Sequence, residues 1–393
     1  MKAKSLVAIP VFLILIALSF SNVVRAIEVT GNISVQQDPY GMAYDTAMNE
    51  IFVVNTNAGT ISVISDSNNT VVATIPLGNP VPIGVAYWIA YDSGKSELFV
   101  SLSYAVNGKV IIISDKSNTV VGEMTVGGEP EGLAYDSAKG EIFVANALSN
   151  AVSVISDKTD TVTANVTVPY GTSNLAYDSV KGEIFAANIP PNNMSNPNAF
   201  SNTVSAISDS SNQVVANISV GNSPQGLTYD QEKNEIFVTN QASQTVSVIS
   251  DKNNQVIKTI PFGEYPYATA YDSSAGEILV ISSNGTGLID PYSVVGTLSV
   301  ISDDSNTVIS SVKLGGAGSS GSSVVYDSAK DEAFVSNSLL GKVSVISDIS
   351  ISSSSSPTVP ELSSLATISV MAIAGIIAVT SVRLKYVRKN KRI

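Results

Sequence analysis

The 393-residue chain contains no cysteine and no histidine. Without cysteine there is neither a disulfide framework nor a thiolate nucleophile, so the stability of the fold depends on its buried core. Without histidine there is no Ser-His-Asp triad, no imidazole general base and no zinc site of the usual composition. These two absences exclude most familiar hydrolase and metalloenzyme mechanisms.

Positive charge is scarce between the two ends of the chain. All 33 acidic residues fall within residues 27–361, where twelve lysines and no arginine leave a net charge of −21. Such a surface repels phosphate backbones, so nucleic acid is excluded as a partner. The lack of arginine in this segment is a further argument against an enzyme.

The first 26 residues have the layout of a secretory signal peptide. Lys2 and Lys4 are followed by a short apolar run, Leu6 to Phe20, and then by small residues ending at Ala26. The run is shorter than the ~20 residues that a membrane span requires. We therefore predict a cleaved signal peptide over residues 1–26, with an uncleaved anchor as the alternative.

The other end of the chain predicts a membrane anchor. Residues 362–382 are uncharged, and a helix of that length spans a hydrocarbon core of ~30 Å. Residues 383–393 carry six cations, which mark the cytoplasmic side. We expect a single-pass membrane protein with its C-terminus in the cytoplasm and residues 27–361 at the cell surface. Residues 349–361, rich in serine, would form a flexible stalk. The alternative, a buried globular helix, conflicts with the cationic tail.

An internal repeat determines the predicted fold. A Tyr-Asp pair occurs seven times at spacings of 42 to 55 residues, and an Ile-Ser-Asp triplet follows each pair. One unit divides into four strand-like segments, at residues 131–135, 141–146, 151–156 and 161–168, separated by polar turns. We predict an all-β fold, a seven-bladed β-propeller of four-stranded antiparallel blades, over residues 27–348.

The strands of each unit differ in ways that predict their places. The first is rich in small residues, which suits a crowded inner ring, and the fourth tolerates Pro76, Pro169 and Pro261, which suits an outer edge. The seventh unit lacks a fourth strand, while the chain begins with a spare one at Val29–Val35. We predict that this N-terminal strand completes blade 7 and closes the ring.

The second strands read Ile51-Phe52-Val53-Val54-Asn55, Ile142 to Asn146 and Ile236 to Asn240. Together with the repeated Thr-Val-Ser-Val-Ile and Pro-x-Gly-x-Ala-Tyr, this pattern resembles the YVTN family of β-propeller repeat proteins over about residues 29–348. In two blades Leu102 and Ser282 replace the strand-ending asparagine. The resemblance implies a surface-layer or envelope protein from an archaeon or a bacterium.

Insertions predict a recognition face. The turns after the first and third strands are short, whereas blades 2, 4 and 6 carry insertions at Asn79–Ile89, Ile189–Ser201 and Ser283–Gly296, all on the opposite face. Aromatic residues in the connections of this face are candidates for glycan or protein contact, although several of them could simply pack the loops down. These candidates are Tyr40, Tyr87, Trp88, Tyr104, Tyr170, Phe200, Tyr265 and Tyr292.

Two further motifs recur in the chain, Asn-x-Ser/Thr sequons and turn aspartates. Six Asn-x-Ser/Thr sequons are glycosylation candidates in an exported chain, and a match by chance accounts for some of them. They are Asn32, Asn68, Asn165, Asn193, Asn217 and Asn284. The repeated aspartates stand where turns require them, and no Asp-x-Asp-x-Asp loop is present, so we expect neither a metal site nor a cofactor.

These observations leave three hypotheses. We favour a non-catalytic binding module of the cell envelope, which would bind a glycan or an envelope protein through the insertion-rich face of blades 2, 4 and 6. A surface-coat component without a discrete ligand is the second hypothesis. The third is a propeller hydrolase of the lactonase kind that uses carboxylates and a calcium ion. Fold analogy does not choose among them.

Overall fold

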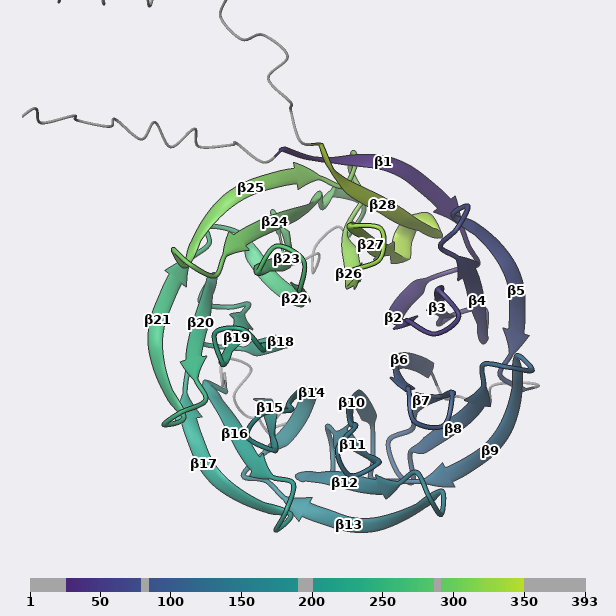
Figure 1. The fold of residues 1–393 in the computed structure, drawn as a ribbon, viewed down its shortest axis with the longest axis vertical. Coiled ribbons are helices and arrows are strands. Elements are labelled where there is room, and N and C mark those ends of the chain that lie inside the picture. Colours follow the sequence, from purple (N-terminus) through teal and green to yellow (C-terminus); the bar gives the residue numbers. More distant parts are fainter. Residues whose placement is uncertain (1–25, 79–84, 190–200, 286–290, 350–393) are drawn as a thin grey trace, which may run out of the picture. The chain divides into compact units, whose positions relative to one another are not determined.

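The computed structural model describes residues 26–78, 85–189, 201–285 and 291–349. Within these ranges the chain forms 28 strands in seven antiparallel sheets of four strands each. The sheets surround a central axis as the blades of a propeller (Figure 1). The predicted seven-bladed architecture is therefore confirmed.

Blade 3 shows how the sequence forms one unit. Its strands are β10 (Pro130–Asp136), β11 (Glu141–Asn146), β12 (Ala151–Ser156) and β13 (Thr161–Thr167), paired in that order. The bounds agree with the sequence prediction to within one residue at every end. The agreement follows from the short polar turns, which leave each strand little freedom to shift.

The other blades repeat this plan. Blade 1 contains β2 (Pro39–Asp45), β3 (Glu50–Asn55), β4 (Thr60–Ser65) and β5 (Thr70–Pro76). Blade 2 contains β6 (Val85–Asp92), β7 (Glu97–Ser103), β8 (Lys109–Ser114) and β9 (Thr119–Thr125). Blade 4 contains β14 (Gly171–Asp178), β15 (Glu183–Ile189), β16 (Thr203–Ser208) and β17 (Gln213–Ser219). Blade 5 contains β18 (Pro224–Asp230), β19 (Glu235–Asn240), β20 (Thr245–Ser250) and β21 (Gln255–Pro261).

Blades 6 and 7 each include a short 3-10 helix. Blade 6 contains β22 (Tyr265–Asp272), β23 (Glu277–Ser283), η1 (Pro291–Ser293), β24 (Gly296–Ser302) and β25 (Thr307–Lys313). Blade 7 contains β26 (Gly321–Asp327), β27 (Glu332–Asn337), η2 (Ser338–Leu340) and β28 (Lys342–Ile349), together with the N-terminal strand β1 (Ala26–Ser34).

The first strand of each blade lies nearest the axis and the fourth lies at the rim, as predicted (Figure 1). Small residues allow the inner strands to approach one another. A Cβ added to Gly41 would lie 2.4 Å from the backbone oxygen of Tyr87 in the next blade. At the rim, Pro76 and Pro261 are the last residues of β5 and β21, where the missing N–H costs no ladder bond.

The ring is closed by strands from opposite ends of the propeller. β1 pairs antiparallel with β28, from Ala26 opposite Ile349 to Ser34 opposite Lys342. Ile33 is buried in an apolar cluster that includes residues of blades 1 and 7. The predicted closing strand is thus confirmed, although it begins three residues earlier than expected.

The apolar core lies between adjacent blades. In one apolar cluster, Phe52 of blade 1 packs with Leu98 of blade 2, so adjacent blades stabilise each other. Six blades bury a phenylalanine of the second strand completely, at Phe52, Phe99, Phe143, Phe185, Phe237 and Phe334. Burial of these apolar side chains contributes about 25 cal/mol per Å² of apolar surface removed from water, so the ring is stabilised without disulfides.

The aspartate of each Tyr-Asp pair has the turn-forming role predicted for it. The Oδ1 atom of Asp45 accepts backbone N–H groups from Ala47 at 2.7 Å and Met48 at 3.1 Å. The turn ends at Asn49, whose φ of 55° lies in the left-handed region that Gly and Asn tolerate. The other six blades also have a positive φ at this position, at Ser96, Gly140, Gly182, Asn234, Gly276 and Asp331.

The predicted terminal segments fall outside the described residues. These are the signal peptide up to residue 25, the stalk from residue 350, the membrane span at 362–382 and the basic tail at 383–393. Among the residues that the structure describes, no helix is long and apolar enough to cross a membrane.

Candidate functional site

Every inner strand has an irregularity at the same point. In β10 the pairing with β11 shifts between Pro130 and Leu133, and the inner strands of the other blades shift at the equivalent place. A bulge bends its strand and changes the direction of a side chain. In blade 3 the residue inside the bulge is Glu131, which lines a cavity at the axis.

This axial cavity has a volume of about 350 Å³. Its lining comes mostly from inner strands of blades 1 to 6, near the ends where these strands begin. The lining residues are Tyr40, Tyr87, Trp88, Ser103, Glu129, Glu131, Ser173, Asn174, Gln225 and Tyr267. Because the inner strands begin at the face opposite the short turns, the cavity lies toward the predicted recognition face.

One wall of the cavity is aromatic. The ring of Tyr40 meets Tyr87 edge to face, with centroids 5.3 Å apart, and meets Trp88 in the same way at 5.5 Å. Burial, and then the charge of Glu131, raises the pKa of Tyr40 to about 12. The Tyr267 hydroxyl donates a hydrogen bond to the backbone oxygen of Gly321. These phenols are therefore neutral at physiological pH, and the contacts hold their rings in place.

The part of the lining that blade 3 supplies is acidic, with Glu129 and Glu131. Burial, and then the neighbouring Glu129, raises the pKa of Glu131 to about 7. Burial also raises the pKa of Tyr87, with further contributions from Asp38, Glu131 and Glu129, so the carboxylates act on the same space as the aromatic rings. No lysine or arginine occurs among the described residues that line the cavity.

Small polar groups complete the lining. The Ser173 hydroxyl is buried and has no hydrogen-bond partner among the described residues. Asn174 also lines the cavity, and its side-chain oxygen accepts the backbone N–H of Leu175 at 2.8 Å. No group of three or more acidic residues in the described part of the chain could hold a metal ion. The arrangement is suited to binding a small polar molecule.

The structure brings together three of the predicted aromatic candidates, but it places them in strands and not in loops. Tyr40, Tyr87 and Trp88 were expected in connecting loops, whereas they lie within the inner strands β2 and β6. The insertion predicted at Asn79–Ile89 is shorter than expected, because β6 already begins at Val85.

Four of the other candidates, Tyr104, Tyr170, Tyr265 and Tyr292, are not among the residues that line the cavity. Tyr104 packs against the apolar cluster between blades 1 and 2, and Tyr265 is the first residue of β22. Tyr170 is 40% exposed and Tyr292 is 69% exposed. Phe200 lies outside the described residues.

Sequence reasoning missed most of the lining, including Glu131 and Tyr267. The signal was nevertheless present in the repeat. The position four residues before the tyrosine of each Tyr-Asp pair varies from blade to blade, and in blades 1, 3 and 5 it is the middle residue of Pro-x-Gly. In blades 1 to 6 it is Tyr40, Tyr87, Glu131, Ser173, Gln225 and Tyr267, and all six line the cavity. Variation at a fixed distance from the constant Tyr-Asp pair indicated a role other than blade packing.

Five of the six sequon asparagines are described, and all five are exposed. They are Asn32, Asn68, Asn165, Asn217 and Asn284, whereas Asn193 lies outside the described residues. Asn165 and Asn217 occupy equivalent outer-strand positions, and each accepts a hydrogen bond from a serine of the third strand at 2.8 Å. Glycosylation at these sites stays a prediction.

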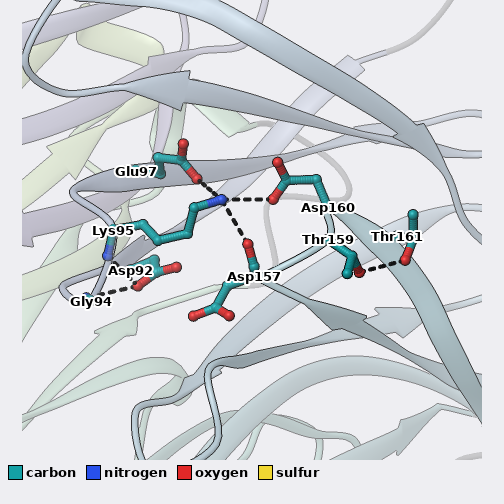
Figure 2. A network of polar contacts seen from close by, with 8 residues as sticks. All are labelled: Asp92, Gly94, Lys95, Glu97, Asp157, Thr159, Asp160 and Thr161. Carbon is teal, nitrogen blue, oxygen red and sulfur yellow. Dashed lines mark hydrogen bonds and ion pairs between the residues drawn. The ribbon is translucent and has the colours of Figure 1, made fainter.

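The face opposite the cavity carries contacts between neighbouring blades. The Nζ atom of Lys95 in blade 2 reaches Asp160 of blade 3 at 2.9 Å, the backbone oxygen of Asp157 at 2.6 Å and Glu97 of its own blade at 3.0 Å (Figure 2). Lys139 makes an equivalent contact with Asp209 of blade 4 at 3.1 Å. These lysines connect adjacent blades, so the acidic residues around them serve the ring itself.

Blade 1 has Met48 in place of that lysine, so this position supplies no cation to the nearby carboxyl groups. The pKa of Asp115 is raised by burial and then by its interaction with Asp45 of blade 1. Glu50 also has a raised pKa, because of burial and the nearby charge of Asp45. This cluster favours protonated carboxyls in the folded state.

The comparisons with known proteins bear on the fold alone. No family model matches the chain, and no curated protein does. Among solved structures, hydrazine synthase of Kuenenia stuttgartiensis is similar, with a TM-score of 0.65 and 14% sequence identity over 79% of this chain and 95% of that chain. At this identity the similarity shows a shared propeller architecture and carries no statement about activity. The resemblance to the YVTN family stays a prediction.

Proposed function

We propose that this chain is a non-catalytic binding module displayed at the cell surface, and that the axial cavity is its ligand site. The predicted signal peptide and C-terminal anchor support display outside the cell. The main support for the site is that one variable position per blade supplies six of the ten residues lining a single cavity.

Binding is favoured over catalysis by the chemistry of the lining. The described part of the lining offers carboxylates, hydroxyls, amides and aromatic rings, but no histidine, cysteine, lysine or arginine. A carboxyl with a pKa of about 7, as at Glu131, could serve as a general acid or base, so product formation is a required readout of the test. The insertion-rich face predicted from the sequence would surround the entrance to the cavity.

A thermal-shift screen tests this proposal. The full chain, purified in detergent, is mixed with amines, amino acids and envelope oligosaccharides, because a ligand that binds the native state raises the melting temperature. We expect at least one compound to stabilise the wild type and the Tyr170→Ala control, but not Tyr87→Ala. A shift that persists in Tyr87→Ala would place binding elsewhere, and consumption of the compound would indicate an enzyme.

A further inference from the structure

We infer that the axial cavity selects a small organic cation, a quaternary or protonated amine of about the size of choline. This inference rests on the proposed function and names the ligand class of the same site. It follows from the charge, the aromatic surface and the size of the cavity.

The first argument is charge. Glu129 and Glu131 line the cavity together, and the described lining supplies no cation to pair with them. A partly buried carboxylate without a partner is costly to desolvate. A cationic ligand would remove that cost, whereas a neutral sugar would leave the two carboxylates paired only with hydroxyl groups.

The second argument is the aromatic wall. Tyr40, Tyr87 and Trp88 form one cluster with edge-to-face contacts, beside the two glutamates. Aromatic faces attract organic cations through the ring quadrupole, and this attraction strengthens where water is excluded. After burial, the charge of Glu131 contributes to the raised pKa of Tyr40, which agrees with the two residues lining the same cavity.

The third argument is size and the type of ligand atom. A volume of about 350 Å³ is near the lower end of small-molecule sites, which span roughly 300–1,000 Å³. Calcium requires six to eight oxygen ligands, and the described residues contain no group of three acidic side chains that could hold a metal. Two carboxylates beside aromatic rings suit a diffuse organic charge better than a compact metal ion.

Isothermal titration of the full chain at pH 8 tests the inference. The probes are choline, tetramethylammonium, calcium chloride and 3,3-dimethylbutan-1-ol, the uncharged isostere of choline. We expect both organic cations to bind at least about tenfold more tightly than the isostere, a factor of ten being about 1.4 kcal/mol. Calcium should not compete with them.

Two variants link the effect to the cavity. Glu131→Gln keeps the shape of the side chain, so we expect choline affinity to fall at least about tenfold and affinity for the isostere to stay constant. Glu123→Gln, an exposed glutamate outside the cavity, is the matched control and should bind as the wild type does. Lowering the pH from 8 to 6 should weaken choline binding in the wild type, because Glu131 becomes protonated.

These experiments distinguish failure of the cation inference from failure of the proposed function. Equal binding of choline and its isostere, abolished by Tyr87→Ala, would overturn the cation inference and leave the binding site in place. Absence of binding by either organic cation would also overturn it. If no compound of the thermal-shift panel stabilised the chain either, the proposed function itself would be refuted.

Discussion

Replacing Ile33 with alanine should destabilise the whole ring, although this residue lies near the start of the chain. Ile33 is 7% exposed on β1 and belongs to an apolar cluster with Val343 of blade 7 and Met42 of blade 1. Truncation of a buried isoleucine costs about 2–5 kcal/mol, and an outer strand favours the lower half of that range. For a domain of this size, each kcal/mol lowers the melting temperature by about 2 °C. We therefore expect a decrease of about 4–7 °C.

Ile260→Ala provides the matched comparison. Ile260 occupies the same position on β21, a regular fourth strand, and is 3% exposed. If β1 is a complete fourth strand of blade 7, the two variants should lose similar free energy of unfolding. The exposed Glu28→Ala on β1 should change stability by less than about 0.5 kcal/mol.

Melting of the full chain, followed by circular dichroism, gives the required numbers. Deletion of residues 27–36 should have a larger effect than Ile33→Ala, because it also removes most of the pairing with β28. A normal melting curve for Ile33→Ala, alongside a clear loss for Ile260→Ala, would refute closure of the ring by β1.

Three further predictions concern the packing of the blades. Because the folded state raises the pKa of Asp115, the stability that this group contributes is present below its ordinary pKa and is lost as the pH rises through the raised value, so Asp115→Asn should flatten the fall in melting temperature with rising pH. A pH profile that is identical in wild type and Asp115→Asn would contradict this account. Gly41→Ala should cost at least about 2 kcal/mol because its Cβ would meet a backbone oxygen of blade 2, whereas Gly316→Ala, with nothing within 4 Å, should be nearly neutral in the same melting assay. Lys139→Ala removes a partly exposed ion pair, so chemical denaturation should reveal a loss below about 1 kcal/mol; a larger loss would mean that this contact does more than join two blades.

Local patterns in the sequence were sufficient to predict the architecture. The number of blades followed from the seven Tyr-Asp pairs, and the strand bounds of blade 3 followed from polar turns whose residues accept a positive φ. Closure by the N-terminal strand followed from the missing fourth strand of the seventh unit. These features depend on short-range turn chemistry and on alternation of apolar side chains, both of which can be read along the chain.

The candidate site depended on tertiary structure. Tyr40, Glu131 and Tyr267 belong to blades 1, 3 and 6 and meet only because the ring brings equivalent positions to one axis. The bulge that directs these side chains toward the cavity lies in strands that otherwise alternate regularly. Sequence reasoning assigned Tyr87 to a loop. The alternation of apolar and polar residues does not by itself show where a connection ends and the next strand begins when the two have similar composition. Strand pairing and curvature of the ring decide which side chains converge, since convergence is a property of contacts between blades rather than of any one repeat.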